Sequence, residues 1–136
     1  MKQNFQASAI VYGESGCYLD SLLESAGGSV DRLRYYRRAF DMKWMQEDCY
    51  ILEPAEILQD LTCKAWICNK QGADYKCKPG EVEILRYERV KAGVTLSHFV
   101  LGDGMGNIKY DPMGDNSPTV RYGTLVSKRI FTEVKV

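Results

Sequence analysis

The only histidine of the chain, His98, stands on a strand-like run, and Asp111 closes the next such run. Residues 97–101 and 107–111 each predict a short strand, and the glycine-rich sequence GDGMGN between them is typical of a tight hairpin turn. A turn centred on residues 104–105 would pair His98 directly with Asp111, so that both side chains share one face. The carboxylate could then hold one imidazole nitrogen, whereas a loop of odd length would put the two side chains on opposite faces.

Cys17 is the strongest candidate for a nucleophile that an oriented His98 could activate. It follows the sequence GESG at the predicted start of a helix. The unpaired N–H groups and the positive dipole end of a helix N-terminus favour a thiolate, and the N–H of Cys17 would point at a developing oxyanion. Cys17, His98 and Asp111 would then form a triad of nucleophile, base and orienting carboxylate. The alternative is a packed cysteine and an ordinary hydrogen-bonded histidine.

Composition sets bounds on the class of protein. The chain has 136 residues, which predicts one domain over residues 1–136. Its 18 basic and 18 acidic residues give no net charge, which argues against a dedicated nucleic-acid surface. The one basic cluster, RLRYYRR at residues 32–38, is interpreted as a solvated helix face. Because no long apolar run and no secretory signal is recognisable, we expect a cytoplasmic protein without a membrane partner.

The cysteines are expected to be free thiols, because their number is odd and the sequence has no secretory context. They are Cys17, Cys49, Cys63, Cys68 and Cys77. The last three of these could be imagined with His98 as a zinc site. Their spacing does not match the paired CxxC motifs that identify such sites, so small buried hydrophobic side chains are the favoured interpretation. We therefore expect no metal and no cofactor.

Three helices are predicted in the first half of the chain. The first begins at Cys17 and ends at the two glycines at residues 27–28. Asp31 caps the second helix, and Pro54 fits the first position of a third helix. The side chains expected to face the core are Leu19, Leu22 and Leu23 in the first helix and Leu33, Tyr36, Phe40 and Trp44 in the second.

The second half of the chain predicts antiparallel strands over residues 63–69, 81–90 and 127–136, in addition to the hairpin. Helices that precede antiparallel strands are typical of an α+β domain, with the helices packed on one side of a sheet. The apolar side chains expected to face inward are Val82, Ile84 and Tyr87 in one strand and Phe99, Leu101, Ile108 and Tyr110 in the hairpin.

The segments GCYLDSLL, HFVLGDG and YDPMG resemble the papain-like cysteine peptidases, above all the peptidase C39-like group. In that group the histidine lies in a strand of sequence H-[FY]-V-V, and a second strand ends in Asp-Pro. With EDCYI and YDPMGDNSPTVRYGTLVSKRIF, nearly the whole chain also resembles small bacterial and phage-borne proteins regarded as papain-like cysteine peptidases. The resemblance implies a papain-like core of N-terminal helices packed on a C-terminal antiparallel sheet. It also implies that Cys17 attacks a peptide or related amide through a thioester, with His98 as base and Asp111 as orienting residue.

One position departs from the pattern of this family. Papain-like peptidases usually carry a glutamine about six residues before the cysteine, and its amide completes the oxyanion hole, but Val11 stands there in this chain. Besides the N–H of Cys17, Ser15 or a folded-back Gln6 could donate instead, whereas an ionised Glu14 would repel an oxyanion. The chain could therefore be a thiol hydrolase, a transferase or deamidase with the same triad, or a catalytically inactive binding or phage accessory protein.

Overall fold

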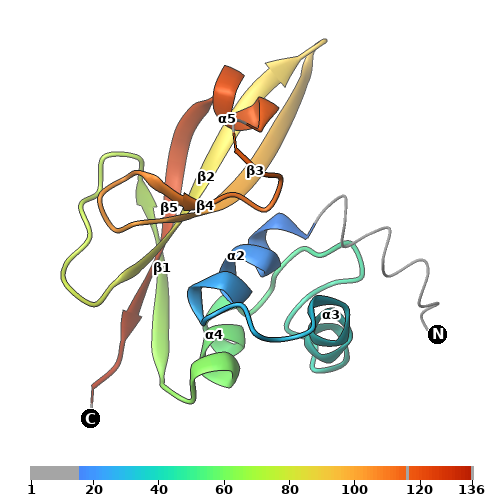
Figure 1. Ribbon diagram of the computed structural model, residues 1–136, viewed down its shortest axis with the longest axis vertical. Coiled ribbons are helices and arrows are strands. Elements are labelled where there is room, and N and C mark those ends of the chain that lie inside the picture. Colours follow the sequence, from blue (N-terminus) through green and yellow to red (C-terminus); the bar gives the residue numbers. More distant parts are fainter. Residues whose placement is uncertain (1–15, 116, 136) are drawn as a thin grey trace.

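The computed structural model describes residues 16–115 and 117–135, and it has the predicted α+β class (Figure 1). Three helices come first, and a further short helix separates the last two strands. In chain order, the elements are α2 (Cys17–Ser25), α3 (Arg32–Asp41), α4 (Pro54–Thr62), β1 (Trp66–Gly72), β2 (Val82–Lys91), β3 (Val94–Gly102), β4 (Ile108–Tyr110), α5 (Pro118–Tyr122) and β5 (Thr124–Glu133).

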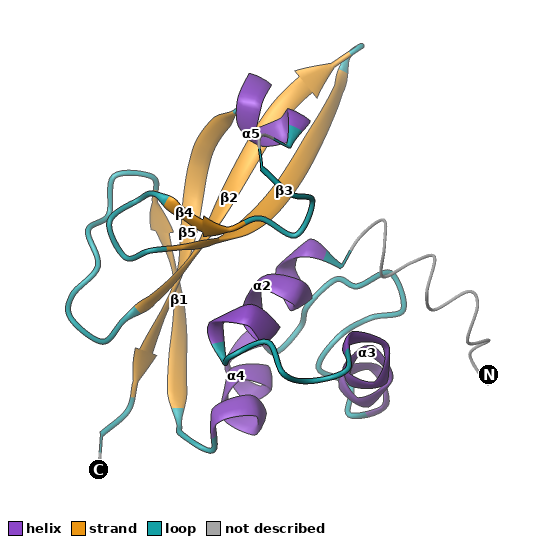
Figure 2. Ribbon diagram, viewed as in Figure 1, coloured by secondary structure: helices purple, strands orange, loops and turns teal. Residues whose placement is uncertain are grey.

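The strands form one antiparallel sheet in the order β1-β5-β2-β3-β4, so the last strand of the chain lies between the first two. Helices α2, α3 and α4 gather beside one end of this sheet, and α5 lies at the other end of β2 and β3 (Figure 2). Helix α5 was not predicted from the sequence. None of the helices in the described part of the chain is long and apolar enough to cross a bilayer.

Local signals in the sequence explain where the first helices begin and end. Helix α2 ends before Gly27 and Gly28, whose positive φ angles of 108° and 69° suit glycine. The Asp31 side chain accepts the N–H of Arg34 at 3.0 Å and caps α3, and Pro54 takes the first position of α4. The strand expected from residue 63 begins three residues later, because Cys63 ends α4 in a left-handed conformation with φ 58°.

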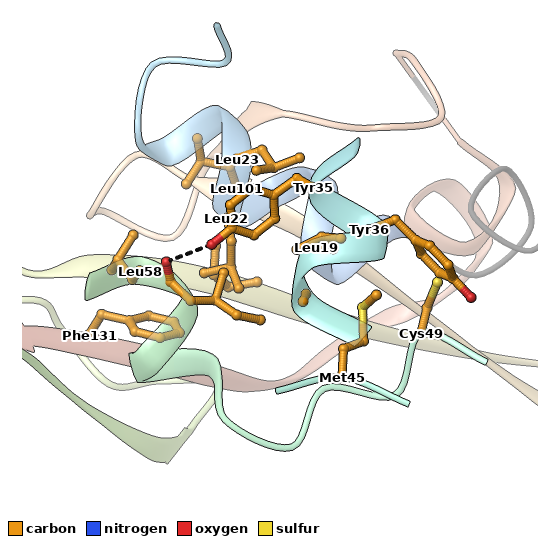
Figure 3. Close-up of a cluster of buried hydrophobic side chains, with 13 residues drawn as sticks. Leu19, Leu22, Leu23, Tyr35, Tyr36, Met45, Cys49, Leu58, Leu101 and Phe131 are labelled. Carbon is orange, nitrogen blue, oxygen red and sulfur yellow. Dashed lines mark hydrogen bonds between the residues drawn. The ribbon is translucent and has the colours of Figure 1, made fainter. Parts of the chain in front are cut away.

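The core lies between the helices and the sheet, and α2 is central to it (Figure 3). The predicted apolar stripe of α3 is correct only for Tyr36. The side chains that α3 buries are Tyr35, Tyr36 and Ala39, while Leu33 and Phe40 are half-buried. Trp44 was counted with this stripe, but it lies beyond the end of α3 and packs half-buried against the core. The buried core side chains are Leu19, Leu22, Leu23, Tyr35, Tyr36, Ala39, Met45, Cys49, Ile57, Leu58, Ile84, Leu101 and Phe131.

Strand β2 departs from simple alternation because both of its faces are covered. Ile84 is buried as predicted, and Val82 and Tyr87 are half-buried. Glu83 is also buried, with 1% of its surface exposed. Its carboxylate lies 3.1 Å from the ammonium of Lys128, which is also buried and comes from β5.

The predicted register of the β3–β4 hairpin is wrong, because His98 is not directly opposite Asp111. Leu101 pairs with Tyr110 and Gly102 with Ile108, with a β-bulge between the two pairs. The connecting loop of residues 103–107 has an odd length, and the bulge compensates for the resulting shift. If the pairing of Leu101 with Tyr110 is extended along both strands, the β3 residue opposite Asp111 is two positions away from His98. Side chains two positions apart on a strand point to the same face, so His98 and Asp111 still share one face of the hairpin.

The inward side of this hairpin is only partly as predicted. Leu101 is buried, and Phe99 and Tyr110 pack half-buried against the core. Ile108 was expected on the same side, but 37% of its surface is exposed. Its partner in β3 is Gly102, which has no side chain to cover it.

Candidate active site

Cys17 is the first residue of α2 and lies against the edge of β3. The first hydrogen bond of the helix runs from the N–H of Asp20 to the carbonyl of Gly16, so the N–H of Cys17 lies outside the helical ladder. The Cys17 Sγ accepts the Phe99 N–H at 3.5 Å. The Ser21 hydroxyl donates to the carbonyl of Cys17 at 2.8 Å and fixes this end of the helix. The predicted nucleophile therefore lies next to the strand residue that follows the histidine.

His98 and Asp111 form a buried pair in spite of the shifted register. The Nε2 of His98 lies 2.6 Å from Oδ1 of Asp111, and the two side chains are only 4% and 5% exposed. Because Asp111 holds Nε2, Nδ1 is the nitrogen left for Cys17. Burial alone would lower the pKa of His98, but hydrogen bonds to Cys17 and Asp111 and their charges outweigh it and raise this pKa above its usual value.

Asp111 is itself held by two donors that the sequence did not reveal. The Met113 N–H donates to Oδ1 at 2.9 Å, and the hydroxyl of Ser117 donates to Oδ2 at 2.5 Å. Ser117 is 3% exposed and immediately precedes α5, where a serine followed by Pro118 is typical of a helix start. Its hydroxyl makes no capping hydrogen bond to α5, because it is directed at the carboxylate. In the sequence, that Ser-Pro pair was the only feature that could have drawn attention to Ser117.

A cavity of about 550 Å³ opens beside Cys17. Its other walls come from Tyr18, the loop of residues 48–51, Pro54 and strands β1, β3 and β5. Tyr18 stacks on Phe99 with ring centres 4.4 Å apart, which forms an aromatic wall next to the sulfur. The cavity is large enough to hold part of a peptide or a small amide.

The five cysteines form no disulfide, and their surroundings differ. Burial is the main cause that raises the pKa of Cys49 to about 12 and that of Cys77 to about 11, and it also raises the pKa of Cys68. Cys63 is exposed. Cys17 alone combines a helix N-terminus, an adjacent imidazole and a position on the cavity wall.

The structure also bears on the other predicted site residues. Within residues 16–115 and 117–135, no group of three His, Cys, Asp or Glu side chains is placed to hold a metal ion. Of the candidate oxyanion donors, only the N–H of Cys17 can be located. Gln6, Glu14 and Ser15, together with Val11 at the position where glutamine was expected, lie outside the described residues.

A comparison with known protein families assigns the chain to one of them. No curated protein and no solved structure matches the chain. One family matches residues 11–133, which include every residue of the site described above. Its description is "Protein of unknown function, DUF261". The chain therefore belongs to the DUF261 family.

Proposed function

We propose that this protein is a papain-like, C39-like cysteine hydrolase that cleaves a peptide or related amide bond. The observation that carries the proposal is the buried pair of His98 and Asp111, 2.6 Å apart, beside a cysteine that begins a helix. The three residues come from α2, β3 and the segment after β4, so the tertiary fold brings them together. A nucleophile, a base and an orienting carboxylate in this order are what thiol-dependent acyl transfer requires.

The first half of the proposed reaction acylates Cys17. Its thiolate adds to the carbonyl carbon, a C–S bond forms, and the π electrons of the carbonyl move to oxygen. The N–H of Cys17, which lies outside the helical ladder of α2, stabilises this oxyanion. When the intermediate collapses, the C–N bond breaks and His98 gives its Nδ1 proton to the leaving amine.

The second half releases the acid. Neutral His98 takes a proton from water while the water oxygen attacks the thioester carbonyl. The second tetrahedral intermediate expels the Cys17 thiolate, which restores the ion pair with protonated His98. Asp111 holds Nε2 throughout, which keeps Nδ1 directed at the reacting atoms and stabilises the imidazolium. An amine acceptor in place of water would make the same site a transferase.

A second candidate function is a catalytically inactive binding protein on the same scaffold. Val11, at the position where papain-like peptidases carry an oxyanion glutamine, favours this alternative. Loss of one oxyanion donor costs about 2.7–4 kcal/mol of transition-state stabilisation, or roughly 100- to 1,000-fold in kcat. The two functions differ in the chemistry they require of Cys17.

The test is the pH dependence of alkylation by iodoacetamide, followed for each cysteine by peptide mass spectrometry. If Cys17 is paired with His98, we expect it to react at pH 6 at least about tenfold faster than exposed Cys63, which is an internal control. His98→Ala should remove this advantage and leave the rate of Cys63 unchanged. Asp111→Asn keeps an acceptor for Nε2 but removes the charge. The rate of Cys17 alkylation in this variant should therefore lie between the rates in wild type and in His98→Ala.

The same experiment decides between the candidates. If Cys17 and Cys63 have the same pH profile in wild type and in His98→Ala, the hydrolase proposal is wrong and an inactive scaffold is favoured. Circular dichroism of each variant establishes that the fold is retained. A reactive Cys17 would then be tested with peptide amides, and Cys17→Ala should abolish their cleavage.

A further inference from the structure

We infer that the cavity beside Cys17 binds a carboxylate of the substrate, so that the bond attacked lies close to an acidic group. This inference names a substrate class for the proposed hydrolase and therefore rests on that function. It depends on two cationic side chains in the cavity wall, Lys70 of β1 and Arg129 of β5.

Lys70 and Arg129 are direct partners in the pairing of β1 with β5, two strands that lie side by side in Figure 1. Partners in an antiparallel pair project to the same face, so both side chains are directed to the wall that they share with Cys17. Like charges directly opposite one another destabilise a sheet. An anion bound between the two cations would remove this repulsion.

Neither Lys70 nor Arg129 forms an ion pair with any residue that the structure describes. Other cations of the chain are paired: Arg38, Arg86 and Lys128 lie 2.6, 2.7 and 3.1 Å from a carboxylate oxygen. Within the described part of the chain, no carboxylate therefore competes with an incoming anionic group for these two cations.

Arg129 is held in place without the use of its full set of donors. Its Nη1 donates to the Ser127 hydroxyl at 3.0 Å, and its guanidinium carbon lies 5.6 Å from the centre of the Phe99 ring. Phe99 in turn stacks on Tyr18, the neighbour of Cys17. A guanidinium has five N–H donors in a planar fork that matches a carboxylate, so a positioned Arg129 retains donors for a bidentate contact.

One carboxylate opposes these two cations. Asp48 is the acidic residue of the cavity wall among those that the structure describes, and its Oδ1 accepts the N–H of Tyr50 at 3.0 Å in the adjoining loop. Among the described residues, the charged side chains that line the cavity are therefore two cations and one anion. This balance favours an anionic substrate group. Removal of the Asp48 charge should therefore strengthen anion binding, whereas removal of either cation should weaken it.

The experiment compares iodoacetate with iodoacetamide as alkylating agents for Cys17 at one pH. The two reagents differ in having a carboxylate or a neutral amide, and both react with the thiolate. The ratio of their rate constants at Cys17 therefore cancels the thiolate fraction and reports the preference of the cavity for an anion. The same ratio at Cys63, measured in the same digest, gives the value for an exposed thiol.

We expect the ratio at Cys17 to exceed that at Cys63 by at least about tenfold at low salt, and to fall towards it in 0.5 M NaCl. Lys70→Gln and Arg129→Gln should each lower the ratio about three- to tenfold, and Asp48→Asn should raise it. Lys91→Gln is the matched control, because Lys91 is an exposed lysine at the far end of β2. It should leave the ratio unchanged.

An equal ratio at Cys17 and Cys63, or one that Lys70→Gln and Arg129→Gln leave unaltered, would overturn the inference. If Arg129→Gln fails to fold, Lys70→Gln and the charge reversal Lys70→Glu decide alone, because Lys70 is exposed. Failure of the proposed function has a different signature. Iodoacetamide would then react with Cys17 no faster than with Cys63 at pH 6. The ratio of the iodoacetate rate to the iodoacetamide rate, measured at pH 9, would still be higher at Cys17 than at Cys63.

Discussion

Replacement of Ser117 by alanine tests whether the carboxylate of the triad is held as the structure describes. The Ser117 hydroxyl donates to Oδ2 of Asp111 at 2.5 Å, and no other described residue donates to that oxygen. Both side chains are buried, Ser117 at 3% and Asp111 at 5% exposure, so water cannot readily replace the hydroxyl. The variant therefore leaves one oxygen of a buried carboxylate without its donor.

The expected cost follows from the charge of the acceptor. A hydrogen bond to a charged group contributes about 1.5–3 kcal/mol to stability. A helix cap contributes a similar amount, about 0.5–2 kcal/mol, but the Ser117 hydroxyl makes no capping bond to α5. The loss in Ser117→Ala should therefore come from Asp111, and it should disappear when Asp111 is also replaced.

The assay is urea unfolding followed by tryptophan fluorescence, in a double-mutant cycle of Ser117→Ala with Asp111→Ala. We expect Ser117→Ala to lower the free energy of unfolding by about 2 kcal/mol alone and by less than about 0.5 kcal/mol in the Asp111→Ala background. Ser25→Ala is the matched control, because among the described residues its hydroxyl bonds only to the carbonyl of Leu22 in its own helix. An equal loss in both backgrounds would refute the reasoning and identify the hydroxyl as a helix cap.

Two further predictions concern buried ionisable groups. Glu83→Ala should lower the free energy of unfolding by about 3–5 kcal/mol in urea, because it leaves Lys128 buried without its carboxylate, and adding Lys128→Met should restore part of the loss; no recovery would contradict the pairing. The raised pKa of His98 means that its protonation stabilises the folded state fully below about pH 6.5, and that this contribution is lost as pH rises through the folded-state pKa. The difference in unfolding free energy between wild type and His98→Gln should therefore shrink from pH 6 to pH 9, and a constant or growing difference would count against a raised pKa.

The features that the sequence predicted well depend on neighbours along the chain. The two glycines at residues 27–28 end α2, Asp31 caps α3, and Pro54 begins α4, because each acts within one helical turn of its own position. The α+β class followed from the order of such segments. The closeness of His98 to Asp111 was predicted for a partly wrong reason, since the assumed register does not occur.

The features that the sequence did not reveal depend on contacts between distant segments. Burial of Tyr35 in place of Leu33 is decided by what α3 packs against, which periodicity alone does not specify. Ser117 is six residues from Asp111 along the chain, but its role requires the turn that brings its hydroxyl back to the carboxylate. The position of Lys70 opposite Arg129 requires β5 to lie beside β1, a pairing that the order of strands in the chain does not indicate.

The register of the hairpin shows how a distant residue can determine the site. An odd loop of residues 103–107 would by itself put His98 and Asp111 on opposite faces. Buried Glu83 accepts the N–H groups of Gly104 and Gly106 at 2.8 and 2.9 Å, which fixes the loop next to the bulge that corrects the register. A hairpin that slipped by one residue would lose both of these hydrogen bonds and would leave a charged side chain buried with fewer partners. The buried carboxylate of β2 therefore favours the one register in which the imidazole meets Asp111.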